Sequence, residues 1–308
     1  MRLATVDIGG VETCVAALRD GRALDLAAAQ PGIGVVQGGR SVLSLQALID
    51  GGAAALAAVR GVVAAAEAGA HAHAIHPSAS LAFRAPIPVP RKNVFCVGRN
   101  YAEHIAEGAR AQKTTINVTE VPVFFTKPPT SVVGHEAPVP IFPRVSTKID
   151  YEVELALIIG TRGRDIAPAD AYRHIFGYTI LNDVSARDVQ RRHGGQFFKG
   201  KALDGSCPMG PWVVTADEIE DPMALRMQLW VNGELRQNET TAAMIFDIPA
   251  LIASLSEGLT LEPGDILATG TPSGVGYAMD PPHYLQDGDE MVCEIEGIGR
   301  LSNTLHAV

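Results

Sequence analysis

Three carboxylic acids stand at alternate positions in the segment DYEVELALIIG, which covers residues 150–160. Successive side chains on a strand point to opposite faces, so a strand here would place Asp150, Glu152 and Glu154 on one face. Like charges at this spacing repel each other, and a buried carboxylate is costly unless a cation or hydrogen bonds compensate it. A solvated strand face would avoid that cost, but the unbroken apolar run LALII argues against an exposed strand. The pattern therefore indicates that a cation lies among the acids.

A further acid, Asp183, follows an apolar strand in GYTILNDVSARDVQ, at the point where polar residues begin. Together with Glu152 and Glu154 it would supply hard oxygen ligands, and neither segment contains a histidine or a cysteine. Such a set suits magnesium, manganese or calcium and disfavours zinc or copper.

His104 and Glu107 lie three residues apart in YAEHIAEG, which reads as a short helix. Residues at this spacing share one face of a helix, so the two side chains are within mutual reach. A histidine that is oriented by a carboxylate can take a proton from water. The alternative is an ordinary contact on the surface of the helix.

The bulk composition bounds the kind of protein. The chain has 308 residues, of which 47% are hydrophobic and 19% are charged, and this is enough to bury a full core. A formal net charge of −9 argues against a general nucleic-acid or anionic-membrane surface. The first residues lack the pattern of a signal peptide, and no apolar stretch approaches the roughly 20 residues of a membrane span. We therefore expect a cytoplasmic protein with four reduced, buried cysteines.

The two parts of the chain differ in composition and in secondary-structure signals. Residues 1–90 contain short strands with glycine-rich turns, an alanine-rich helical segment and a proline-bearing linker, which predicts a small N-terminal α/β domain. Residues 91–308 are rich in strand and turn signals, such as the hairpin signal Asn232-Gly233 and a helix with Asp247 as its N-cap, Pro249 in its first turn and Gly258 after its end. This predicts an α+β, β-rich catalytic domain with a few short helices.

Seven motifs in register carry a resemblance to a known family. Their sequence, in chain order, is VGRNYAEHIAE, PVFFTKPPTSVVGH, DYEVELALIIG, GYTILNDVSARDVQ, KGKALDGSCPMGPW, LWVNGELRQNETTAAMIFDIPALI and LTLEPGDILATGTPSGVG. Over about residues 93–304 the chain resembles the fumarylacetoacetate hydrolase family. The resemblance implies a mixed β-sandwich roll for residues 91–308, and residues 1–90 resemble the variable N-terminal domain of many bacterial members.

The resemblance also implies roles for individual residues. It implies that magnesium or manganese, with calcium as a non-native occupant, is held by Glu152, Glu154 and Asp183. Asp150 is then a supporting or a surface residue. The resemblance further implies that His104 and Glu107 form a water-activating dyad on a lid that continues into residues 108–120. Lys201 would stabilise an oxyanion or enolate. Contacts to the substrate carboxylate would come from Gln190, Thr271, Arg99 and Tyr101.

From these motifs we predict a metal-dependent hydrolase that cleaves a C–C bond in an acylpyruvate or a related 2,4-dioxo acid. The alternatives that use the same site are an oxaloacetate decarboxylase, an isomerase or tautomerase of a 2-oxo acid, and a hydrolase of diketo deoxy sugar acids. The expected partner is a small anionic oxo acid, without nucleic acid or membrane, and family analogy predicts a homodimer.

Overall fold

The apolar half of the segment with the alternating acids forms a buried strand, β13 (Val153–Ile159), in the computed structural model, which describes residues 1–37, 39–116 and 118–308. The prediction of one strand for all three acids is wrong, because Asp150 lies on the separate strand β12 (Ile149–Asp150) and Glu152 lies between the two strands. All seven residues of β13 are buried. Leu155 and Leu157 pack into one apolar core, whereas Ala156 and Ile158 pack into another on the opposite face. Burial of a leucine or isoleucine side chain contributes about 1.5–3 kcal/mol, so the strand is held from both sides.

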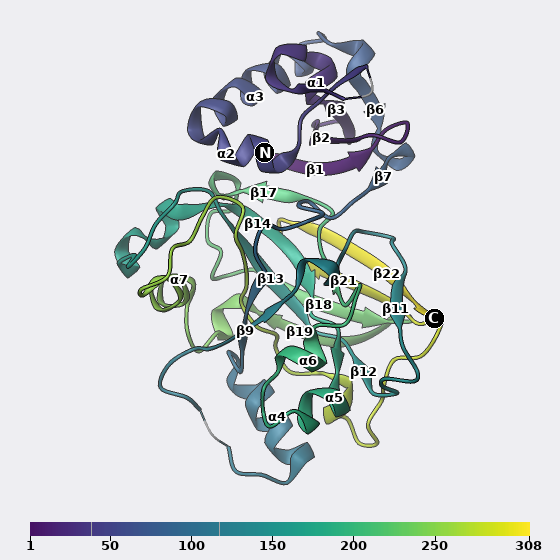
Figure 1. Cartoon of the computed structure of the whole chain (residues 1–308), viewed down its shortest axis with the longest axis vertical. Helices are drawn as coiled ribbons and strands as arrows, with labels where there is room; N and C mark the ends of the chain where they lie inside the picture. The colour runs from purple at the N-terminus through teal and green to yellow at the C-terminus, as the bar shows by residue number, and fades with distance from the viewer. Residues whose placement is uncertain (38, 117) are drawn as a thin grey trace.

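An eleven-stranded sheet runs through the molecule from the upper part to the lower part of Figure 1. β13 lies near its middle, antiparallel to β14 and β20. The order of the strands is β6 (Ile75–Pro77), β3 (Arg22–Asp25), β2 (Glu12–Ala17), β1 (Arg2–Asp7), β17 (Val213–Thr215), β14 (Ile175–Asn182), β13, β20 (Ile266–Ala268), β8 (Val94–Gly98) and β9 (Val123–Lys127), while β7 (Ala82–Phe83) pairs with β1.

A second sheet of five strands covers one side of this core. Its order is β11 (Val139–Ile141), β22 (Gly299–Ala307), β21 (Glu290–Ile295), β18 (Arg226–Val231) and β19 (Glu234–Thr240). The turn between β18 and β19 is the predicted Asn232-Gly233 hairpin, and both residues have a positive φ, 50° and 79°. Short ladders join β10 (Val132–Val133) with β16 (Cys207–Pro208), β12 (Ile149–Asp150) with β15 (Ser185–Ala186), and β4 (Val35–Gln37) with β5 (Arg40–Val42).

The first part of the chain forms the smaller, upper part of the molecule (Figure 1). The predicted alanine-rich helix is present as α2 (Leu45–Asp50) and α3 (Gly52–Glu67), which follow α1 (Leu26–Ala29). β1 pairs with β17, so the sheet continues from this part into the rest of the chain. Part of the predicted linker is a strand, because β7 pairs with the end of β1. A domain boundary near residue 90 stays a prediction.

The helices of the larger part are short. α4 (Ala102–Gln112), α5 (Arg187–Arg192) and α6 (Phe198–Lys201) lie together at the lower end of Figure 1. α7 (Ile248–Ser256) begins as predicted, because the Asp247 side chain accepts a hydrogen bond from the backbone N–H of Ala250. The 3₁₀ segments are η1 (Pro31–Ile33), η2 (Ala72–Ala74), η3 (Ser78–Ser80), η4 (Pro129–Ser131), η5 (Pro168–His174), η6 (Ala216–Glu218), η7 (Thr241–Ala243) and η8 (Gly276–Ala278).

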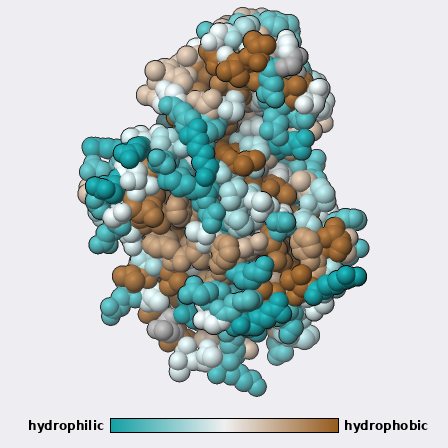
Figure 2. All heavy atoms as spheres, in the orientation of Figure 1, coloured by the Kyte–Doolittle hydropathy of each residue, from teal (hydrophilic) through white to brown (hydrophobic). Residues whose placement is uncertain are grey.

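The overall class matches the prediction of a strand-rich mixed fold with few helices. All four cysteines are buried with free thiols. On the face drawn in Figure 2, apolar side chains gather both on the upper part and in a band across the lower part, between polar side chains. Across the residues that the structure describes, no helix is long and apolar enough to span a bilayer.

Candidate active site

The pairing of β13 with β14 brings acids together that are far apart in the sequence. Val153 pairs with Asn182, and the backbone N–H of Asp183 donates a 2.9 Å hydrogen bond to the carbonyl oxygen of Glu152. Glu154 follows two residues after Glu152 and lies on β13 itself. Each of these three buried acids offers a carboxylate oxygen, and the three oxygens lie within 4.8 Å of one another. The register of the sheet therefore forms an acidic cluster from Glu152, Glu154 and Asp183.

Two buried lysines make ion pairs with this cluster. Lys201 Nζ lies 2.8 Å from Glu152 Oε2 and 2.9 Å from Asp183 Oδ2. Lys127, at the end of β9, places its Nζ 2.7 Å from Asp183 Oδ1 and also donates to the carbonyl oxygens of Val184 and Lys201. Burial disfavours the charged form of Lys201, but the nearby carboxylates of Asp183 and Glu152 outweigh it and raise its pKa.

Asp150 is fully buried, so its interpretation as a surface residue is wrong. Its carboxylate accepts hydrogen bonds from the backbone N–H groups of Gly276 and Tyr277 and from Arg187 Nε at 2.8 Å. Arg187 Nη1 also lies 2.6 Å from Glu152 Oε1. Asp150 therefore supports the cluster through Arg187, which it holds beside Glu152.

The electrostatics of the cluster fit a hard divalent cation. Among the described residues, three cationic side chains (Lys127, Lys201 and Arg187) face four carboxylates. Burial opposes ionisation of Glu152, but Lys201 and Arg187 lower its pKa to about 2. The pKa of Glu154 is instead raised well above its ordinary value, by burial and then by the charges of Asp183 and Glu152. An all-oxygen donor set with one uncompensated carboxylate suits magnesium, manganese or calcium.

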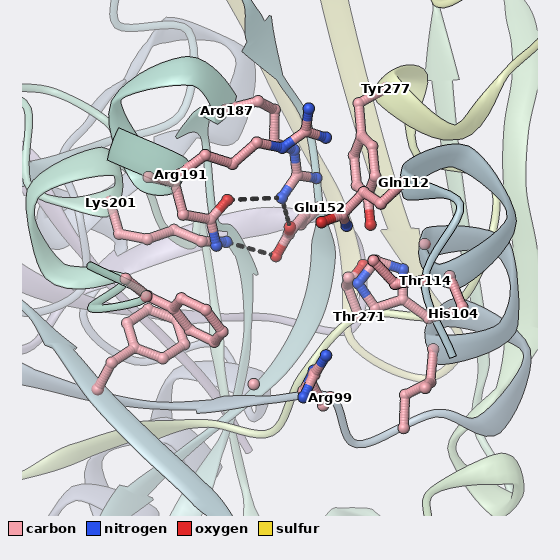
Figure 3. Close-up of a pocket in the computed structure, with 18 of the residues that line it drawn as sticks. Arg99, His104, Gln112, Thr114, Glu152, Arg187, Arg191, Lys201, Thr271 and Tyr277 are labelled. Atoms are coloured by element: carbon pink, nitrogen blue, oxygen red, sulfur yellow. Dashed lines mark hydrogen bonds and ion pairs between the residues drawn. The ribbon is translucent and has the colours of Figure 1, made fainter. Parts of the chain in front are cut away.

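A cavity of about 440 Å³ opens beside the acidic cluster. Glu152 and Lys201 line it, and Figure 3 shows both near its centre. The other lining residues are Val97, Gly98, Arg99, His104, Ile105, Gly108, Ala109, Gln112, Thr114, Thr115, Phe125, Arg187, Gln190, Arg191, Gly195, Phe197, Thr271 and Tyr277. The cavity therefore brings most of the predicted catalytic and substrate-binding residues to one place.

The predicted pair on α4 is formed. His104 Nδ1 lies 2.8 Å from Glu107 Oε1, and both side chains are largely buried, with exposed fractions of 13% and 11%. Glu107 Oε2 accepts a second hydrogen bond from the backbone N–H of Gly274. Because Nδ1 is engaged with Glu107, Nε2 is the ring nitrogen of His104 that remains for a ligand in the cavity.

Two predicted substrate contacts, Gln190 and Thr271, lie in the cavity wall. Gln190 stands on α5, where its Oε1 accepts a 3.4 Å hydrogen bond from Arg187 Nη1. The Thr271 hydroxyl accepts a hydrogen bond from Gln237 Nε2, and Gln237 Oε1 accepts one from the backbone N–H of Val153. Gln237 therefore links the loop of Thr271 to the strand of the acidic cluster.

The other two predicted contacts, Arg99 and Tyr101, lie in different surroundings. Arg99 lines the cavity and has a left-handed backbone with φ of 60°, which is uncommon outside glycine. Tyr101 does not line the cavity. It is buried in the core just before α4, and its hydroxyl donates to Met227 Sδ at 3.6 Å. The structure therefore does not support a direct substrate contact from Tyr101.

The lid predicted over residues 108–120 contributes Gly108, Ala109, Gln112, Thr114 and Thr115 to the cavity wall. Residue 117 of this segment lies outside the described residues. Movement of the segment over a substrate stays a prediction.

Sequence reasoning missed four residues of the site, namely Lys127, Arg187, Arg191 and Tyr277. The position of Lys127 at the end of the apolar strand VFFTK could have indicated its role, since a lysine is seldom buried without a partner. Arg187 lies four residues after Asp183, in a segment that the sequence analysis already singled out. Tyr277 carries no local signal, because only the tertiary structure brings η8 to the cavity.

The chain matches the family model described as "Fumarylacetoacetate (FAA) hydrolase C-terminal" over residues 93–306. It is 50% identical over 222 residues to oxaloacetate tautomerase YisK of Bacillus subtilis (strain 168), which covers 72% of each chain.

Solved structures resemble the whole chain. A fumarylacetoacetate hydrolase from psychrophilic Exiguobacterium antarcticum has a TM-score of 0.81 at 39% identity, and the match covers 100% of both chains. Maleylpyruvate hydrolase from Sphingobium sp. SYK-6, in complex with manganese(II) ion and pyruvate, has a TM-score of 0.77 at 32% identity, and the match covers 100% of this chain and 99% of that one.

Proposed function

Because the chain belongs to the fumarylacetoacetate hydrolase family, we propose that it interconverts the keto and enol forms of a small 2-oxo acid with the help of a divalent metal ion. This is the tautomerase alternative of the sequence analysis. It is supported by the 50% identity to an oxaloacetate tautomerase. The observation that carries it is the position of Lys201, whose ammonium group touches two acids of the cluster while the side chain lines the cavity.

Glu152, Glu154 and Asp183 would hold the metal ion. Magnesium and manganese are the preferred candidates, and the manganese in the related maleylpyruvate hydrolase structure supports this choice. When bound, the ion would act as a Lewis acid that polarises a carbonyl oxygen.

Lys201 would stabilise the negative charge that develops on the 2-oxo oxygen. Its ammonium group has three N–H donors, and Glu152 and Asp183 use two of them. The third donor is available to a ligand in the cavity. The raised pKa keeps Lys201 charged at neutral pH, so its contribution is electrostatic and it is a poor general base.

His104 would move the proton. Its Nε2 takes a proton from C3 of the keto acid, the C–H electron pair forms the C2–C3 double bond, and the electron pair of the C2=O double bond moves onto the 2-oxo oxygen. The proton that Nε2 accepted is then passed to this oxygen, which gives the enol and restores neutral His104. The reverse sequence returns the keto form. Glu107 orients the ring, because it accepts the hydrogen bond from Nδ1 and so leaves Nε2 for the substrate.

The test is enzyme-dependent relaxation of oxaloacetate between its enol and keto forms, followed by the ultraviolet absorbance of the enol. We expect magnesium or manganese to support the reaction and exhaustive chelation to abolish it. His104→Ala should lower the rate by roughly a hundredfold or more, the usual scale for the loss of a general base. His193→Ala is the matched control, since His193 is exposed and does not line the cavity. A relaxation rate that the metal-loaded protein leaves unchanged would refute the proposal.

Hydrolysis of an acylpyruvate is the second candidate, and the His104–Glu107 hydrogen bond favours it. The same His104 Nε2 could take a proton from water, which would then attack the distal carbonyl carbon of the substrate. Incubation with acetylpyruvate distinguishes the two reactions. Acetate and pyruvate, identified by mass, indicate hydrolysis, whereas exchange of the C3 protons with deuterium and no cleavage indicates tautomerisation alone.

A further inference from the structure

Two arginines of α5 lie over the same aromatic ring in the wall of the cavity. The guanidinium carbon of Arg187 is 4.5 Å from the centre of the Tyr277 ring, and that of Arg191 is 5.2 Å from it. In the view of Figure 3 both arginines lie to the left of Tyr277, above Glu152. Stacking on an aromatic face orients a guanidinium group and leaves its N–H donors free for other partners.

One N–H donor group of Arg187 has no hydrogen-bond partner among the described residues. Its Nε binds Asp150 and its Nη1 binds Glu152 and Gln190, but its Nη2 is buried and has no hydrogen-bond partner among the described residues. The whole side chain is only 4% exposed. A buried donor without an acceptor is unfavourable, so an oxygen that reached Nη2 would be stabilised there.

Arg191 has a charge to spare. It lines the cavity, and within the described part of the chain it makes no ion pair with a carboxylate. Two like charges that stack on one ring repel each other, and an anion between them would reverse the sign of that interaction. Arg187 already pairs with Asp150 and Glu152 of the acidic cluster, so Arg191, stacked on Tyr277, is the arginine of this wall whose charge is left for an anion.

We propose that Arg191 binds a second carboxylate of the substrate and thereby selects dicarboxylic over monocarboxylic 2-oxo acids. This inference rests on the proposed function, in which the 2-oxo oxygen lies beside Lys201. The planar guanidinium fork of Arg191 matches the two oxygens of a carboxylate. The cavity of about 440 Å³ has room for a short dicarboxylic acid between the two ends.

A pair of inert ligands tests this assignment directly. Malate and 2-hydroxybutanoate have the same carbon chain and differ only in that a methyl group replaces the second carboxylate. Their dissociation constants are measured by calorimetry on the magnesium-loaded full-length protein. Arg191→Met should weaken malate binding roughly tenfold to a hundredfold, the scale of a lost charge-assisted hydrogen bond, and should change 2-hydroxybutanoate binding by less than about twofold.

The control is Arg192→Met, because Arg192 is exposed on α5 as Arg191 is, but does not line the cavity. Arg191→Lys should keep only part of the preference for malate, since it keeps the charge but loses the planar fork. Equal weakening of both ligands by Arg191→Met, or an equal loss of malate binding in Arg192→Met, would overturn the inference. The proposed function is judged separately, by enol relaxation in the wild-type protein. If Arg191→Met loses the preference for malate but the wild-type protein has no tautomerase activity, the role of Arg191 is supported and the proposed reaction is refuted.

Discussion

Replacement of Lys127 by methionine should destabilise the protein strongly although Lys127 does not line the cavity. Its ammonium group is fully buried, lies 2.7 Å from Asp183 Oδ1 and donates to three further oxygens, those of Val184, Lys201 and Ser206. Methionine has a similar length but removes every one of these contacts. Removal of one partner of a buried ion pair costs about 3–5 kcal/mol. In the metal-free variant Asp183 keeps only Lys201 as a cationic partner within the described ranges, and that lysine also pairs with Glu152.

The loss should be seen in thermal unfolding of metal-free protein. For a chain of this size, 3–5 kcal/mol corresponds to a decrease in the melting temperature on the order of 10 °C. Lys199→Met is the matched control, since Lys199 is an exposed residue of α6 and its replacement should change stability by less than about 0.5 kcal/mol. Magnesium should recover more stability in Lys127→Met than in wild type, because the variant has one positive charge fewer beside Asp183. A melting temperature within 2 °C of wild type, on the scale of roughly 2–4 °C per kcal/mol, would refute this account of Lys127.

Three further predictions follow from the site. The pKa of Glu154 is raised in the metal-free folded state, so the contribution of its protonated form to folding stability is fully present below the ordinary pKa of 4.5 and is lost as the pH rises through the raised pKa. The pKa of Glu152 is lowered, so its contribution to folding stability is present above pH 4.5 and is lost as the pH falls toward about 2. Metal affinity, measured by calorimetry, should therefore increase with pH as Glu154 loses its proton, and an affinity that is independent of pH would contradict this assignment. Gly200→Ala should impair activity and stability together, because a Cβ there would lie 2.5 Å from the backbone nitrogen of Gln190, and Gly194→Ala is a control with open space but a strained backbone. The homodimer expected from family analogy is checked by sedimentation, where a monomer at micromolar concentration would remove it.

The local elements of the site are largely determined by the sequence. The alternation of acids before an apolar run predicts a buried strand with a charge that needs compensation, and β13 is such a strand for Glu154 and the apolar run, although Asp150 lies on β12. The spacing of His104 and Glu107 predicts a contact on one helix face, and the two side chains are hydrogen-bonded on α4. These inferences succeed because the periodicity of a strand or a helix is set by the backbone within a few residues.

The compensation of the acids was decided by the tertiary structure. Asp183 reaches Glu152 only because β14 pairs with β13 in one register, and a shift by one residue would turn its side chain to the opposite face. Lys127, Arg187 and Lys201 come from three different elements, β9, α5 and α6, and no local spacing relates them. Tyr101 shows the reverse error, because the sequence motif predicts that it contacts the substrate whereas the structure packs it into the core. Spacing along the chain specifies which side chains share a face, whereas the charges that face them depend on which distant strands and helices the hydrophobic core packs together.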